Sequence, residues 1–144
     1  MRELKFRAWN LWKEGPTLMD WDELMSMSMD GVFGDEAYGN GSLVLEQYTG
    51  LVDRHGKEIY EGDIVKITHI SWKDTPDERI EHVFASDVWW SDFYASFCYT
   101  EPGDDYHAKT EPMMFNSRSM EIEIIGNIHE NPNLLDADAT KHHE

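Results

Sequence analysis

Carboxylates are the residues of this chain whose types and spacing come nearest to chemistry. Glu61 with Asp63, and Glu121 with Glu123, are two residues apart, which places both members of a pair on one face of a strand. General acid–base catalysis needs two such groups converging in a pocket. The structural alternative, which we favour, is that Asp63 caps the turn before Ile64 and that Glu121 and Glu123 line the solvent face of a half-buried strand.

The histidines lack the spacing of a metal site. They include no His-x-x-x-His pair, and there is no cysteine pair to join them. His142, His143 and Glu144 cluster at the end of the chain, where we expect only accidental metal affinity. The other five are scattered singly: His55, His69, His82, His107 and His129. We therefore expect no metal and no cofactor.

The single cysteine, Cys98, lies among aromatic residues in DFYASFCYT and has no histidine partner evident in the sequence. A nucleophilic thiol needs such a partner, so we expect a buried, inert thiol in a reducing compartment. The N-terminus MRELKFRAW carries charges where a signal peptide needs an apolar core, and no run is long enough to span a membrane. A cytoplasmic location is the expectation.

Aromatic residues are crowded into eleven positions of VWWSDFYASFCYT, and they form the candidate interaction surface. One alternative is core and edge packing in a small domain, and the other is an exposed patch for a partner or for self-association. If the run is one strand, both of its faces are apolar, so we expect a homo-oligomer that tightens as salt rises. The candidate residues are Trp89, Trp90, Phe93, Tyr94, Phe97 and Tyr99.

The net charge of −17, from 29 acidic and 12 basic residues, is spread along the chain. Direct nucleic-acid binding is unexpected because phosphates are held by clustered Lys and Arg. The simpler explanation of this charge is a solvated acidic surface. The sharper alternative is an acidic DNA mimic that inhibits a host nucleic-acid-binding enzyme, which would need its acids along one elongated face.

Short alternating segments joined by polar turns predict a mainly β fold, a barrel or sandwich, with α+β character at the N-terminus. We expect a helix from Asp20 to Gly31, a turn at DRHG with Gly56 at positive φ, and one sheet system containing 62–70 and 119–130. The expected strands cover 4–9, 43–51, 64–70, 79–90, 92–100 and 120–130. The expected core comprises Ile64, Val65, Ile67, Val83, Phe84, Val88, Ile122, Ile124 and Ile128.

Three separated motifs carry a family resemblance: KFRAW, YTGLVDRHGKEIYEGDIVKI and EIIGNIHENPNLL. In this order they resemble the YopX family of phage and prophage proteins. The resemblance implies an SH3-like small barrel and a phage setting, with no catalytic residues to carry over. We then expect an N-terminal subregion at 1–41, the barrel region at 42–135 and a frayed tail at 136–144.

These observations favour a non-enzymatic protein-interaction module encoded by a phage. The DNA mimic is the alternative, and a hydrolase is a third, weakly supported one. No fold-level argument assigns an activity, because small barrels host many functions.

Overall fold

The computed structural model describes residues 3–11, 15–27, 43–74, 77–103, 109–113 and 119–135. It is mostly β, with a short helix at Trp21–Met25 and a further helical segment at 133–135 among these residues, which confirms the predicted class in its coarser form. The chain divides into two compact units, Met1–Gly50 and Leu51–Glu144. The boundary expected at 41/42 and the tail at 136–144 lie outside the described residues.

The N-terminal unit contains strands β1 (Phe6–Asn10), β2 (Thr17–Met19) and the first part of β3 (Leu43–Val52), in the order β2-β1-β3. Both pairings are antiparallel, and Ala8 lies opposite Leu45. Helix α1 (Trp21–Met25) begins where Asp20 accepts the backbone N–H of Glu23, as predicted. A small core joins the helix to the sheet: Ala8, Leu24 and Leu43 are buried, with Phe6, Met19, Met27 and Leu45 packed against them.

Helix α1 is shorter than the sequence suggests. It ends at Met25, and the predicted end at Gly31 lies outside the described residues. The hydroxyl of Ser26 donates to the carbonyl of Glu23 at 2.7 Å, which satisfies one of the orphaned carbonyls of the last turn. The Met-rich sequence that follows could not show this end, because its periodicity is ambiguous.

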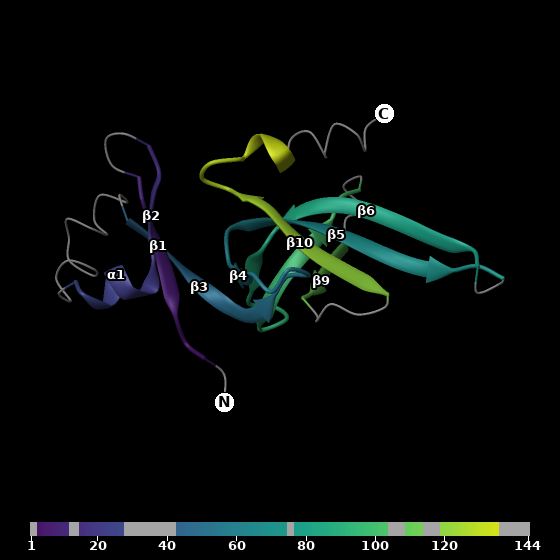
Figure 1. The fold of residues 1–144 in the computed structure, drawn as a ribbon, viewed down its shortest axis with the longest axis horizontal. Coiled ribbons are helices and arrows are strands. Elements are labelled where there is room, and N and C mark those ends of the chain that lie inside the picture. Colours follow the sequence, from purple (N-terminus) through teal and green to yellow (C-terminus); the bar gives the residue numbers. More distant parts are fainter. Residues whose placement is uncertain are drawn as a thin grey trace. The chain divides into compact units, whose positions relative to one another are not determined.

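In the described part of the C-terminal unit, strands β4 to β10 follow the last residues of β3 (Figure 1). Their bounds are β4 (Glu58–Tyr60), β5 (Asp63–Trp72), β6 (Arg79–Asp87), β7 (Trp89–Ser91), β8 (Ser96–Glu101), β9 (Lys109–Pro112) and β10 (Met120–Asn127). They form one sheet of order β10-β5-β6 and another of order β7-β8-β9, while β4 neighbours β3. The expectation that 62–70 and 119–130 share a sheet is confirmed, because β5 pairs with β10 from Asp63 to His69, with one shift of register between Ile124 and Gly126.

The core of this unit gathers between the strands, with most of the predicted residues in it. Ile64, Val65, Ile67, Phe84, Val88 and Ile122 are buried, and Ile124 packs against the cluster. Two predictions are wrong: Val83 is 48% exposed and Ile128 is 37% exposed. Val83 lies opposite Thr68 in β5, on the face that alternates with the one carrying Phe84 and Ile67.

The DRHG turn after β3 is fixed by one buried carboxylate. Asp53 accepts hydrogen bonds through Oδ1 from the backbone N–H groups of His55 (2.9 Å) and Lys57 (3.0 Å), and through Oδ2 from Ile124 (3.1 Å) in β10. Gly56 has φ +82°, which confirms its predicted conformation. The turn therefore docks on β10 through a side chain that has no catalytic geometry.

The segment IIGNIHENPN, at the end of β10, contains a second turn held by a polar side chain. Asn127 accepts the backbone N–H groups of His129 and Glu130 through Oδ1, at 3.0 and 2.9 Å. The side chain of Asn131 returns over Gly126, where an added Cβ would lie 2.7 Å from Oδ1 and 3.0 Å from Cβ of Asn131. Gly126 is thus required by close packing.

Two predicted segments fold differently. The strand expected at 92–100 begins at Ser96, because residues 92–95 form the turn between β7 and β8. The segment 100–112, which reads as a polar connection in the sequence, contains strand β9, and β9 pairs with β8 through Tyr99 and Glu111. Lys109–Pro112 does not alternate between apolar and polar residues, so the sequence pattern does not predict a strand there. The strand forms by pairing with β8.

Replacing Asp53 with Asn should lower the free energy of unfolding at neutral pH by about 2 to 3 kcal/mol, because an amide nitrogen would face a backbone N–H. Burial alone would raise the pKa of Asp53, but the N–H groups of Ile124, Lys57 and His55 outweigh it and lower that pKa below 3.8. A lowered folded-state pKa contributes stability above the unfolded pKa that is lost as pH falls through the folded one.

Urea unfolding of the wild type and D53N from pH 7 down to pH 3 checks this. The difference between the two proteins should shrink on the acid side. A constant difference across that range would show that the Asp53 carboxylate charge contributes nothing.

Replacing Gly126 with Ala should lower the free energy of unfolding by about 1 to 3 kcal/mol, because the new methyl group overlaps the Asn131 side chain. The matched experiment is the same substitution in an Asn131→Ala background, where the overlap with Oδ1 is gone. Chemical denaturation of all four proteins gives the coupling energy. Equal costs in both backgrounds would contradict the packing described.

Candidate interaction surface

The turn between β7 and β8 has a fixed geometry. Ser91 pairs with Ser96 at its base, and the hydroxyl of Ser91 accepts the backbone N–H of Tyr94 at 3.2 Å. The indole N–H of Trp90 donates to Oδ1 of Asp92 at 3.0 Å. Ala95 has φ +48°, a left-handed conformation that costs a non-glycine residue about 1 kcal/mol. The surrounding bonds hold the turn in this conformation.

Three of the predicted aromatic residues are exposed on this turn. Phe93 is 88% exposed, Tyr94 45% and Trp90 41%. The rings of Phe93 and Tyr94 meet edge to face, with centroids 5.0 Å apart and an interplanar angle of 87°. We call Trp90, Phe93 and Tyr94 the aromatic turn.

The other three predicted residues lie inside the fold. Phe97 and Tyr99 belong to the core cluster, and Trp89 is half-buried with its indole N–H donating to the Thr100 hydroxyl at 3.1 Å. The run is not one strand, since the chain reverses and Trp90 packs on Phe97 with ring centroids 5.1 Å apart. The six residues are therefore divided between core and surface.

A cluster of aromatic and imidazole rings surrounds Phe84. Ring centroids of His69 and His82 lie 5.6 Å from that of Phe84, and Tyr99 lies 5.8 Å from it. Nε2 of His69 is buried and has no hydrogen-bond partner among the residues that the structure describes. No short sequence motif predicts this cluster. Aligning the two strands of the β5–β6 hairpin would have predicted it, because His69 lies directly opposite His82.

Two polar groups of the cluster, on His82 and Tyr99, are paired with glutamate side chains. Nε2 of His82 lies 2.7 Å from Oε1 of Glu101, and the Tyr99 hydroxyl donates to Oε2 of Glu111 at 2.7 Å. Burial, followed by the bond and charge of Glu111, raises the pKa of Tyr99 far above its usual value. The phenol therefore stays protonated and serves as a hydrogen-bond donor, not as a base.

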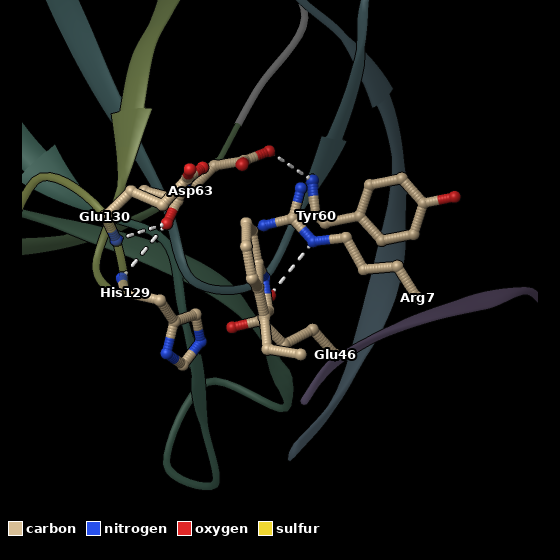
Figure 2. A network of polar contacts seen from close by, with 8 residues as sticks. Arg7, Glu46, Tyr60, Asp63, His129 and Glu130 are labelled. Carbon is tan, nitrogen blue, oxygen red and sulfur yellow. Dashed lines mark hydrogen bonds and ion pairs between the residues drawn. The ribbon is translucent and has the colours of Figure 1, made fainter. Parts of the chain in front are cut away.

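The carboxylates that suggested acid–base chemistry have structural partners. Oδ2 of Asp63 accepts the backbone N–H of Tyr60 at 2.8 Å, which confirms the turn-capping alternative (Figure 2). Glu121 lies 3.4 Å from Arg54, and Glu123 lies 3.0 Å from Lys66 and 3.3 Å from His55. Lys66 first, and then His55, lower the pKa of Glu123. These four acids do not converge: Glu61 lies in the turn between β4 and β5, and Glu121 and Glu123 of β10 lie beside bases.

The N-terminal unit has a buried ion pair that sequence reasoning missed. Oε1 of Glu46, which is 2% exposed, accepts from Nε of Arg7 at 2.9 Å (Figure 2) and from the indole of Trp9 at 2.8 Å. Arg7 pairs with Glu46 in the β1–β3 register, so the KFRAW motif supplies both donors. The motif thus has a structural explanation in this unit.

Cys98 is fully buried, and burial raises the pKa of its thiol, as expected for an inert cysteine. Within the described ranges, no group of three His, Cys, Asp or Glu residues has the geometry to hold a metal ion. Over the same ranges, no helix has the length and apolarity needed to cross a membrane.

Replacing His69 with Phe should leave the free energy of unfolding unchanged or raise it by about 1 kcal/mol. The substitution keeps a ring on Phe84 and removes a buried nitrogen without a partner. His82→Phe is the matched control, since it deletes a contact with Glu101 and should not stabilise. Thermal unfolding monitored by circular dichroism compares them, and a loss above 2 kcal/mol in H69F would show that Nε2 has an essential partner.

The fold has a solved counterpart. The crystal structure of protein EF1440 from Enterococcus faecalis matches with a TM-score of 0.53 and 22% identity, over 94% of this chain and 99% of that one. At this identity the likeness concerns the fold alone. No curated protein matches the chain. The model of the family described as YopX protein matches residues 5–136, nearly the whole chain, and the chain belongs to that family.

Proposed function

We propose that this chain is a phage-type interaction module that binds a partner protein through its aromatic turn. The observation that carries the proposal is Phe93, 88% exposed at the tip of a turn whose backbone is held by the Ser91 hydroxyl and whose Asp92 side chain accepts the Trp90 indole. Membership of the YopX family supports the phage setting. Cytoplasmic action in a bacterial host is part of the proposal.

The exposed rings of the aromatic turn contribute little to the free energy of folding. Apolar surface left in water forgoes about 25 cal/mol per Å², so nothing in folding favours a phenylalanine at this position. Turn tips ordinarily carry Gly, Asn, Asp or Ser. A rigid, exposed aromatic side chain loses little conformational entropy on binding, which is why such residues dominate binding energy at interfaces.

The DNA-mimic alternative has less support. A mimic needs acids that present free charge along one face, and Glu121 and Glu123 of β10 instead lie beside Arg54, Lys66 and His55. A hydrolase would need convergent catalytic groups, and the aligned carboxylates here serve turns and ion pairs. For the barrel itself, the antiparallel strands β5, β6, β8 and β10 around one core support an SH3-like arrangement as the finer fold proposal.

A double substitution of Phe93 and Tyr94 by Ser should abolish capture of host proteins by the immobilised chain without unfolding it, because both side chains are exposed. Quantitative mass spectrometry of captured proteins, with circular dichroism of each variant, measures this. Val83→Ser, which removes another exposed apolar side chain on β6, is the control and should retain capture. If F93S/Y94S and wild type capture the same proteins equally, the aromatic turn is not the binding surface.

A further inference from the structure

The partner of the aromatic turn can be specified by its chemistry, and this step rests on the proposed function. Two candidates compete for the surface: a second copy of this chain, and a segment of another protein. The size of the patch, its charge and its ring geometry separate them.

The patch is small. A stable interface buries about 800 Å² on each side and involves some 20 to 30 residues. The aromatic turn offers three exposed rings, two of which are less than half exposed. Two apolar neighbours in the hairpin, Phe97 and Cys98, are already buried within the chain. A short segment, and not a second globular face, fits this area.

Along the sequence, the segment that contains the turn carries charge of one sign. From residue 80 to residue 108 the sequence contains six acidic residues and no Lys or Arg. Asp92 lies on the turn itself, with Oδ1 accepting the Trp90 indole. A second copy would bring another net charge of −17 to this surface, whereas a cationic segment would meet a complementary one.

The rings present the geometry that a planar cation uses. The rings of Phe93 and Tyr94 stand at 87° to each other and form a corner, and Phe93 is 88% exposed and Tyr94 45%. A guanidinium stacks on one such face while its N–H groups reach a carboxylate, a combination an ammonium reproduces less well. Asp92 is the carboxylate nearest in sequence to both rings.

We infer that the aromatic turn binds an arginine-bearing segment of a partner protein, with the guanidinium on the Phe93–Tyr94 corner and its charge balanced by Asp92. Stacking of the guanidinium on the rings and its attraction to Asp92 both contribute to the affinity. Binding of this kind weakens as salt rises. Self-association through the same rings would instead strengthen as salt rises, because salt screens the repulsion between two acidic chains.

Fluorescence anisotropy with a labelled octapeptide of alternating Arg and Gly tests the inference. The wild type should bind it more tightly than the corresponding Gln–Gly peptide, and more weakly as salt is raised from 50 to 300 mM. Phe93→Ala should reduce the affinity for the Arg peptide about two- to fivefold without changing the charge of the protein. Asp92→Asn, which keeps an acceptor for the Trp90 indole, should also reduce it, while Glu78→Gln in a different turn is the control for the loss of one acidic charge.

Several results would overturn the inference: no binding, equal affinity for the two peptides, or affinity for the Arg peptide that is the same in the wild type and F93A. A homodimer that forms through Phe93 and tightens with salt, seen by light scattering in the same buffers, would assign the surface to a second copy. If captured host proteins depend on Phe93 and Tyr94 but do not elute with salt, the proposed function stands and the arginine-bearing partner is wrong.

Discussion

The pairing of β5 on both sides is the constraint on which the C-terminal unit depends. This strand lies antiparallel to β6 along one edge and to β10 along the other (Figure 1). Its residues are buried on both faces over most of its length, Ile64 and Val65 completely. Because β6 continues through Val88 into β7, the register of β5 fixes the base from which the β7–β8 hairpin and its aromatic turn extend.

The family motifs are explained largely by buried hydrogen-bond acceptors. Asp53, Asp63 and Asn127 each accept backbone N–H groups at a turn, and all three are at most 9% exposed. A carboxylate or amide in such a position satisfies N–H groups that no strand ladder can reach. Asp53 and Asp63 of the strand-rich segment 43–67 therefore serve to hold turns.

Much of the fold could be predicted from the sequence because alternation and turn chemistry are local. Ile64–Ile70 shows the period of a strand, and Gly56 marks a turn that needs a positive φ. The aromatic run could not be divided correctly from pattern alone, since both faces are apolar and the signal for reversal is a single Ser91 side chain bonding to Tyr94 N–H. Pairing across strands brings His69 beside His82 and Arg7 beside Glu46, and such contacts between distant residues have no local signature.

The aromatic turn matters to function only if it is as ordered as the strands that carry it. Backbone ¹⁵N relaxation of residues 91–96 measures this most directly, since it reports order on the picosecond to nanosecond scale. The hydrogen bonds of Ser91 and Asp92 predict order parameters near those of β8, about 0.85. Values below about 0.6 at Phe93 and Tyr94 would show a flexible loop and would contradict a preorganised binding surface.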